Sequence, residues 1–222
     1  MITVKPYNWK NFEIVGAFII CLILAANAVV FKDSLVAVFS AFFGITYTTL
    51  AGKGNPKCYL FGLAGSGLYG YLAFSNAVWG NLLLYMFYYI PMQTIGFFKW
   101  NKNLKAEKNE IIKTKLPPKE RYIITTVSLS AILIFAGILC LTGDKSPVID
   151  GITTVLSISG MYLTVKRCIE QWQVWMIVNG LSALMWIKIA LEGEAVYSTV
   201  LMWIVYFILA VYFYKEWKNE VV

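Results

Sequence analysis

The sequence predicts an all-α integral membrane protein with eight transmembrane helices, one extra N-terminal helix followed by a core of three, one and three helices. Of the 222 residues, 59% are hydrophobic and 14% are charged, and the mean hydropathy is +0.66. Soluble domains do not have this composition. Several apolar runs approach the roughly 20 residues that a helix needs to cross a bilayer. A third observation, an internal repeat, gives the order of the core.

The apolar runs place the helices in order and leave no room for a soluble domain. The first run resembles a signal peptide because Ala26-Asn27-Ala28 is similar to a cleavage site. Its leading segment is long and contains Glu13, so we expect a retained helix; cleavage would leave seven. The eight predicted helices lie near Phe12–Phe31, Asp33–Ala51, Cys58–Phe74, Trp79–Phe98, Tyr122–Thr142, Val148–Val165, Trp172–Ala190 and Val196–Tyr214.

The basic residues predict the orientation of these helices. When the 19 Lys and Arg residues are sorted by the predicted side, 16 fall on one side and 3 on the other, namely Lys32, Lys145 and Lys188. The positive-inside rule then places both termini in the cytoplasm. The net charge of +7 is therefore a topology signal rather than a nucleic-acid footprint, and no nucleic-acid partner is expected.

An internal repeat predicts two parallel three-helix units. A shift of 117 residues places Tyr85–Trp100 on Met202–Trp217. A three-helix unit ends on the side opposite its start, so one further helix must intervene between parallel copies. Chance similarity between aromatic membrane helices is the alternative. The repeat divides the chain into residues 1–31, 32–100, 101–142 and 143–222, and its matched pairs are Tyr89 with Tyr206, Phe97 with Tyr214, and Trp100 with Trp217.

The one long loop, Lys99–Arg121, is strongly basic and contains Pro117-Pro118. We expect a solvated cytoplasmic linker that helps to fix the orientation. Attraction to anionic lipid is a less specific alternative.

Residue types exclude several kinds of site. The chain has no His, which removes haem axial histidines and His-dependent catalysis. Its four Cys lie on separate helices without CxxC spacing, so neither a zinc site nor a disulfide framework is expected. We therefore predict no metal, no cofactor and no enzyme activity.

The segment Glu170–Trp186 carries the main candidate site. At about 100° per residue, one helical face collects an amide, a hydroxyl and three indoles. A primary amide at membrane depth is costly unless it is paired or wetted, so this face should look at a cavity or at another helix. The alternatives are an interfacial belt for the tryptophans and interhelical contact for the amide. The face comprises Trp172, Trp175, Asn179, Ser182 and Trp186.

The predicted helix Trp79–Phe98 has the second unexpected polar position. Gln93 shares a face with Tyr89 and, less closely, with Tyr85. Pro91 removes a backbone donor and can kink the helix toward a cavity. Gln93 lies roughly 9 Å from its helix end and Asn179 roughly 12 Å from its own, at similar depth in different copies. A transporter built of two repeats should hold its substrate there.

At this point the residues resemble a known family. Arg167–Asn179 contains a WxxWxxxN signature, and Pro91–Trp100 contains PxQxxGFxxW. Both are similar to motifs of the PnuC family of nicotinamide riboside transporters, along about Asp33 to Trp217. The resemblance implies a seven-helix core related to SWEET transporters and a homotrimer in the bacterial inner membrane. It also implies facilitated diffusion with trapping by a cytoplasmic kinase. By motif position, the implied binding residues are Trp172, Trp175, Asn179 and Gln93.

The chemistry of these residues suits a flat pyridinium riboside. Indole faces attract such a cation by about 0.5–2 kcal/mol each. Amides can form hydrogen bonds with both hydroxyls and a carboxamide. No carboxylate lies mid-helix, which argues against ion coupling. No phosphate cradle is visible, so we expect the dephosphorylated riboside. Thiamine or another vitamin or nucleoside is the alternative substrate. A membrane enzyme would need converging groups, and Glu170, Asp150 and Lys188 do not converge.

Overall fold

The computed structural model describes residues 9–30, 32–76, 79–104, 110–141, 147–194 and 196–221. All regular elements in these ranges are helical, and six of the helices are long and apolar enough to cross a membrane, as judged by length and composition: α1, α2, α6, α7, α8 and α9. The elements are α1 (Asn11–Val29), α2 (Leu35–Gly52), α3 (Cys58–Ser75), α4 (Trp79–Leu84), η1 (Tyr85–Tyr89), α5 (Ile90–Asn101), α6 (Pro118–Leu141), α7 (Pro147–Val165), α8 (Glu170–Leu191) and α9 (Tyr197–Lys218).

The helix predicted near Trp79–Phe98 is a rod of three pieces, with the π-helix η1 between α4 and α5. The Ile90 N–H bonds the carbonyl of Tyr85, five residues back. Pro91 offers no N–H, and its ring clashes with the carbonyl four residues before it, so the turn ahead of it widens. The expected kink at Pro91 is therefore a π turn.

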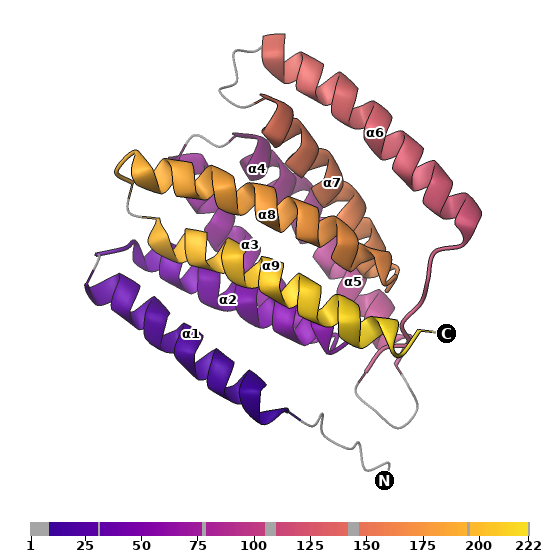
Figure 1. Cartoon of the computed structure of the whole chain (residues 1–222), viewed down its shortest axis with the longest axis horizontal. Helices are drawn as coiled ribbons and strands as arrows, with labels where there is room; N and C mark the ends of the chain where they lie inside the picture. Colours follow the sequence, from indigo (N-terminus) through magenta and orange to yellow (C-terminus); the bar gives the residue numbers. More distant parts are fainter. Residues whose placement is uncertain are drawn as a thin grey trace.

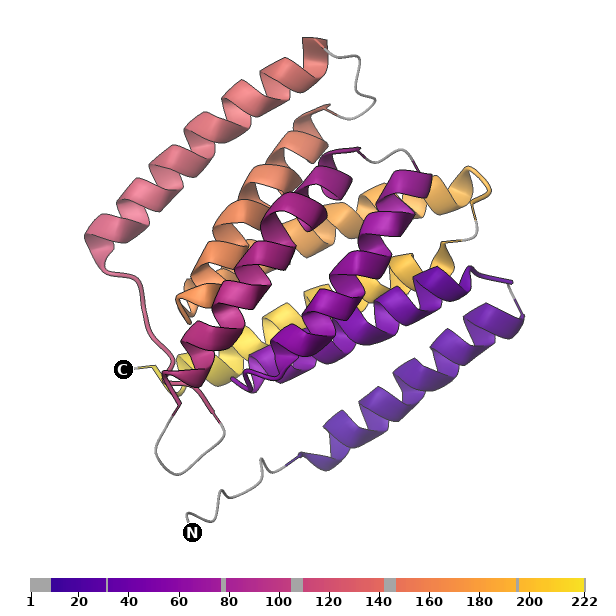
Figure 2. The same ribbon diagram turned by 180° about the vertical axis from the view of Figure 1, so that it is seen from behind.

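Six rods form a closed ring. Around it α2 contacts α3, α3 contacts the α4–η1–α5 rod, that rod contacts α7, α7 contacts α8, α8 contacts α9, and α9 returns to α2. Figure 1 shows α8 and α9 on the near side, and Figure 2 shows α3 and the α4–η1–α5 rod on the other. Chain neighbours are thus ring neighbours, and the first and last ring helices close the circle.

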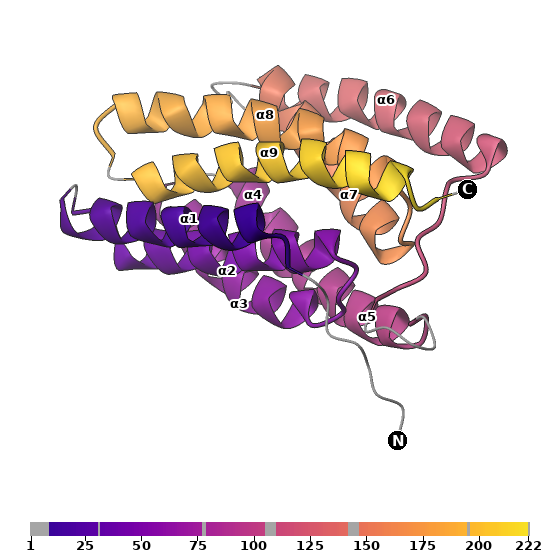
Figure 3. The same ribbon diagram turned by 60° about the horizontal axis from the view of Figure 1, so that its bottom comes forward.

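Two helices lie outside the ring. Helix α1 packs mainly on α2, and α6 packs on α7. Figure 1 shows them on opposite flanks, and Figure 3 shows the N-terminal end of α1 and the C-terminal end of α9 at the same end of the bundle. We call this the basic end, because Lys10, Lys53, Lys166 and Lys218 lie there at helix termini.

Residues 110–117 are partly buried, which corrects the expected solvated linker for this segment; residues 105–109 of that linker lie outside the described residues. Ile111 is fully buried, and its N–H donates to the Gly54 carbonyl at 3.0 Å. Thr114 exchanges backbone bonds with the turn after α7, donating to the Arg167 carbonyl and accepting from Ile169, each at 2.9 Å. The segment therefore lies across the basic end and bonds the turns that follow α2 and α7.

Candidate functional site

A cavity lies in the middle of the ring, and all six ring rods contribute to its wall. The empty space between the lining atoms is about 720 Å³, a figure that includes the part open to the outside. The outer helices α1 and α6 contribute no lining residue. The wall comprises Ser40, Gly44, Tyr47, Thr48, Ala51, Gly62, Gly65, Ser66, Tyr69, Tyr85, Tyr89, Gln93, Met161, Thr164, Gln171, Trp172, Trp175, Asn179, Met202, Trp203 and Tyr206.

All six residues predicted for the site line this cavity. They come from η1, α5 and α8 and are Tyr85, Tyr89, Gln93, Trp172, Trp175 and Asn179. Trp172 is 2% exposed and Asn179 is 3% exposed, so neither belongs to an interfacial belt or to the lipid-facing surface. Trp186 was expected on the same face but packs beyond the cavity, where its indole donates to the Tyr69 hydroxyl at 2.8 Å.

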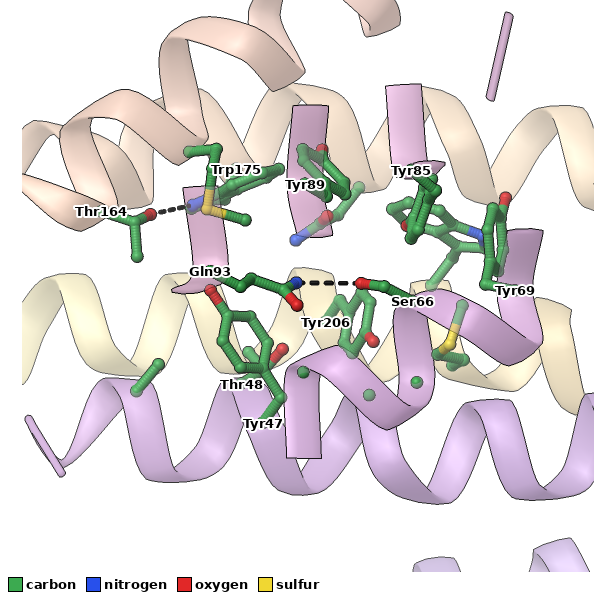
Figure 4. Close-up of a pocket in the computed structure, with 18 of the residues that line it drawn as sticks. Tyr47, Thr48, Ser66, Tyr69, Tyr85, Tyr89, Gln93, Thr164, Trp175 and Tyr206 are labelled. Atoms are coloured by element: carbon green, nitrogen blue, oxygen red, sulfur yellow. Dashed lines mark hydrogen bonds between the residues drawn. The ribbon is translucent and has the colours of Figure 1, made fainter. Parts of the chain in front are cut away.

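The indole of Trp175 is held in place from two sides. Its Nε1–H donates to Thr164 Oγ1 at 3.0 Å (Figure 4). Its ring lies on the bare backbone of Gly160, where an added Cβ would come within 3.1 Å of the ring atoms. The ring of Tyr89 stands edge-on at 6.4 Å between centroids. One face of a fixed aromatic plane is thereby left available inside the cavity.

Several buried polar atoms on the wall have no hydrogen-bond partner within the described part of the chain. They are Ser40 Oγ, Tyr47 OH, Gln93 Oε1, Trp172 Nε1 and Trp203 Nε1. Buried polar groups are almost always bonded in native structures, so such atoms point to water or to a polar ligand. The Asn179 side chain, on α8, likewise makes no hydrogen bond with any described residue.

The cavity lies between two buried aromatic clusters. Toward the basic end, Trp100, Trp217 and Tyr59 pack with Ile111 of the 110–117 segment. Toward the other end, Tyr69 stacks on Tyr85 at 4.3 Å between centroids and meets Trp186 edge-on. Figure 4 shows Tyr69 and Tyr85 together at one side of the site, and Trp175 with Thr164 at the other. Aromatic side chains therefore flank the cavity toward both ends of the bundle.

No charged side chain is among the lining residues. The described residues also hold no group of three or more His, Cys, Asp or Glu that could bind a metal ion. The wall offers aromatic faces, hydroxyls and amides. Such a wall can stack a flat ring and bond neutral polar groups, and it has no counter-ion for a phosphate.

Several lining residues from both halves of the chain were not predicted from the sequence. Tyr206 was available from the repeat, which pairs it with Tyr89. Its hydroxyl lies against the bare backbone of Gly44 on α2, where an added Cβ would come within 1.9 Å. Ser66 and Thr164 gave no sequence signal, because a lone Ser or Thr hydroxyl in an apolar helix usually bonds its own backbone. Tyr47 gave none because an aromatic residue in an apolar helix usually serves packing.

Comparison with known proteins gives a consistent result. The family described as "Nicotinamide mononucleotide transporter" matches residues 34–219. A relative named nicotinamide riboside transporter PnuC, from Neisseria mucosa, is 32% identical over 225 residues, covering 96% of this chain and 83% of its own length. A relative of the same name from Haemophilus influenzae is 32% identical over 218 residues, covering 96% and 92%. A solved structure described as the vitamin B3 transporter PnuC has a TM-score of 0.85 at 30% identity, covering 96% of this chain and 92% of the other.

Proposed function

The chain belongs to the nicotinamide mononucleotide transporter family, and we propose that it carries nicotinamide riboside across the membrane by facilitated diffusion. The observation that carries this proposal is the central cavity, walled by indoles and phenols and carrying buried polar atoms without a partner in the described part of the chain. Trp175 and Trp172 would stack the pyridinium ring. Asn179 and Gln93 would bond the carboxamide and the ribose, with Tyr89 and Tyr85 completing the wall.

The uncharged character of the lining residues supports a riboside rather than a mononucleotide as the substrate. A phosphate needs Arg, Lys or a cluster of backbone N–H groups to replace its hydration. No Lys or Arg lines the cavity. A cation needs no carboxylate there, because aromatic faces attract it. Phosphorylation by a cytoplasmic kinase would trap the riboside after entry, since the product no longer suits the cavity.

The contacts also support the proposed repeat architecture, with residues 32–100 and 143–222 as parallel three-helix units joined by α6. The ring order α2, α3, α5, α7, α8, α9 places equivalent helices opposite each other. The indoles of Trp100 and Trp217, matched by the repeat, make equivalent bonds to the ends of α7 and α2. We place the basic end in the cytoplasm by the positive-inside rule, in a bacterial inner membrane, with the chain as a homotrimer.

Calorimetry tests the substrate. Purified protein is titrated with nicotinamide riboside, thiamine and riboflavin, and we expect heat of binding from the first alone. Binding of thiamine or riboflavin instead would replace this substrate with another vitamin of the same size class. Trp175→Ala should abolish the quenching of tryptophan emission by the ligand, and a variant that still quenches fully would remove Trp175 from the site.

Uptake into liposomes tests the mechanism. We expect nicotinamide riboside to equilibrate at the same rate with and without a proton gradient, because no lining residue carries a titratable carboxylate. Accumulation above the external concentration in the presence of the gradient would show coupled transport and contradict facilitated diffusion.

A further inference from the structure

We propose that Ser66 is a positioning residue that fixes the polarity of Gln93, so that the cavity demands a hydrogen-bond donor from its ligand at that point. The proposal rests on the proposed function, because it concerns how the same cavity selects its substrate. Ser66 lies on α3 and Gln93 on α5, in the first half of the ring. Neither residue is charged, so the selection is made by hydrogen-bond direction alone.

The contact that carries the proposal is one hydrogen bond. Gln93 Nε2 donates to Ser66 Oγ at 2.9 Å, and both side chains are buried, at 2% and 4% exposure (Figure 4). A primary amide has one acceptor end and one donor end. Once the nitrogen is bonded to Ser66, the oxygen is the end left for the ligand. Gln93 Oε1 is indeed buried without a partner within the described part of the chain.

The surroundings keep the amide in this position. It packs on the bare backbone of Gly62, where an added Cβ would lie 3.1 Å from Gln93 Cδ and 3.2 Å from Nε2. An unpaired carbonyl oxygen in a buried site costs free energy until a donor reaches it. A ligand with an N–H or O–H group at this point gains that hydrogen bond. A ligand with a carboxylate or an ether oxygen there places one acceptor against another, and Gln93 Oε1 stays without a donor.

The consequence is a selection rule between closely similar ligands. In nicotinamide riboside the donors are the carboxamide NH₂ and the ribose hydroxyls. An analogue that lacks the donor facing Gln93 should bind about tenfold more weakly than the parent, the usual effect of an unmet buried polar atom. Removing Ser66 frees the amide to turn its nitrogen toward the ligand, so the penalty on that analogue should shrink.

The experiment measures Kd by calorimetry for the parent and for analogues that each lack one donor, an N,N-dimethyl carboxamide and the 2′-, 3′- and 5′-deoxy ribosides. Which analogue suffers in the unmodified protein identifies the donor that faces Gln93. In Ser66→Ala we expect that one penalty to fall below about threefold, while the penalties on the other analogues keep their values. A uniform weakening of every ligand, or no change, would overturn the positioning role.

Two further variants test whether Ser66 acts through Gln93 and whether the loss of another buried hydroxyl has the same effect. In Gln93→Met the same penalty should vanish, and adding Ser66→Ala to it should change nothing more, because Ser66 acts through Gln93. Ser182→Ala removes a hydroxyl of equal burial that does not line the cavity, and should leave all ratios unchanged. If the unmodified protein bound no nicotinamide riboside, the proposed function would fail; if it bound but Ser66→Ala left the ratios intact, only this inference would fail.

Discussion

The two halves of the chain join each other through the same contacts made twice. The indole of Trp100 at the end of α5 donates to the Thr164 carbonyl at the end of α7, at 3.0 Å. The indole of Trp217 at the end of α9 donates to the Gly52 carbonyl at the end of α2, at 2.6 Å. Each half of the chain thus donates one indole hydrogen bond to the other at the basic end.

The outer helices repeat the same plan with different burial. Glu13 near the start of α1 pairs with Lys53 after α2 at 2.7 Å, and both side chains are under 10% exposed. Glu120 near the start of α6 pairs with Lys166 after α7 at 2.5 Å, with side chains 44% and 29% exposed. The two ion pairs lie at corresponding positions, but their contributions to the free energy of unfolding should differ.

The halves diverge where they face the cavity. Helix α8 presents Trp172, Trp175 and Asn179, whereas α3 presents Gly62, Gly65, Ser66 and Tyr69. The two indoles of α8 and the bare backbone of two α3 glycines thus line the same empty volume. The contacts that assemble the protein are therefore duplicated, and the contacts available to a substrate are not.

Breaking the buried ion pair should have the largest effect. Glu13→Gln removes the carboxylate that pairs with the buried Lys53 ammonium and weakens the bond from the Tyr212 hydroxyl. We expect a loss of about 3 kcal/mol in the free energy of unfolding, the low end for a broken buried pair, because the ammonium keeps its contact with the Trp9 ring at 4.6 Å. Glu120→Gln is the matched change in the other half and should cost under about 1 kcal/mol, because that pair is exposed. Denaturant unfolding in detergent measures both. Equal losses would mean that burial does not distinguish the two pairs.

Removing either inter-half indole bond should have the next largest effect. Trp100→Phe and Trp217→Phe keep an aromatic ring but remove the indole donor from the carbonyl of Thr164 or Gly52. The Thr164 carbonyl still accepts from the Arg167 N–H at 2.9 Å, so Trp100→Phe should fall at the lower end of the expected range. We expect about 1–3 kcal/mol of destabilisation from each, by the same assay. If the two halves are equivalent at this end, the two values should agree within about 1 kcal/mol. If one variant left the free energy of unfolding unchanged while the other lowered it, the proposed equivalence of the two halves would be wrong.

The sequence predicted the helices and six of the 21 lining residues for a physical reason. Apolar runs, basic loops and the Trp100–Trp217 match depend on local composition or on periodicity, and both are visible in a single chain. Asn179 and Gln93 stood out because an amide at membrane depth is expensive. That cost made them detectable without any knowledge of their neighbours.

The remaining wall residues were invisible because their role depends on tertiary contacts. Ser66 and Thr164 matter through the Gln93 and Trp175 side chains that they hold, and those partners lie on other helices. The packing of residues 110–117 was missed for a similar reason. A basic, proline-containing loop has the composition of a solvated linker, but Ile111 fits between the turn after α2 and the tryptophans of the basic end.

Changing the amide of the second half sharpens the comparison at the cavity. Asn179→Leu keeps the number and branching of the side-chain heavy atoms and should leave the fold intact, since no described residue bonds the Asn179 side chain. We expect binding of nicotinamide riboside to weaken by about 1–3 kcal/mol, the loss for an unmade polar contact. Calorimetry measures the affinity, and thermal unfolding serves as the control. Unchanged affinity would make Asn179 a packing residue, as in the alternative weighed from the sequence.

The smallest expected effect tests whether the bare backbone of α3 is itself part of the wall. In Gly62→Ala the new Cβ would lie 2.8 Å from the Tyr47 ring and 3.1 Å from Gln93 Cδ, so both side chains must shift. We expect binding to weaken by about 1 kcal/mol, the low end for overpacking. Gly67→Ala, on the same helix with nothing within 4 Å of the new Cβ, should leave binding unchanged and raise stability by roughly 0.5–1 kcal/mol, because alanine loses less backbone entropy in a helix. If both variants bound equally well, the glycines of α3 would reflect helix packing alone, and the asymmetry between α3 and α8 would have no bearing on the substrate.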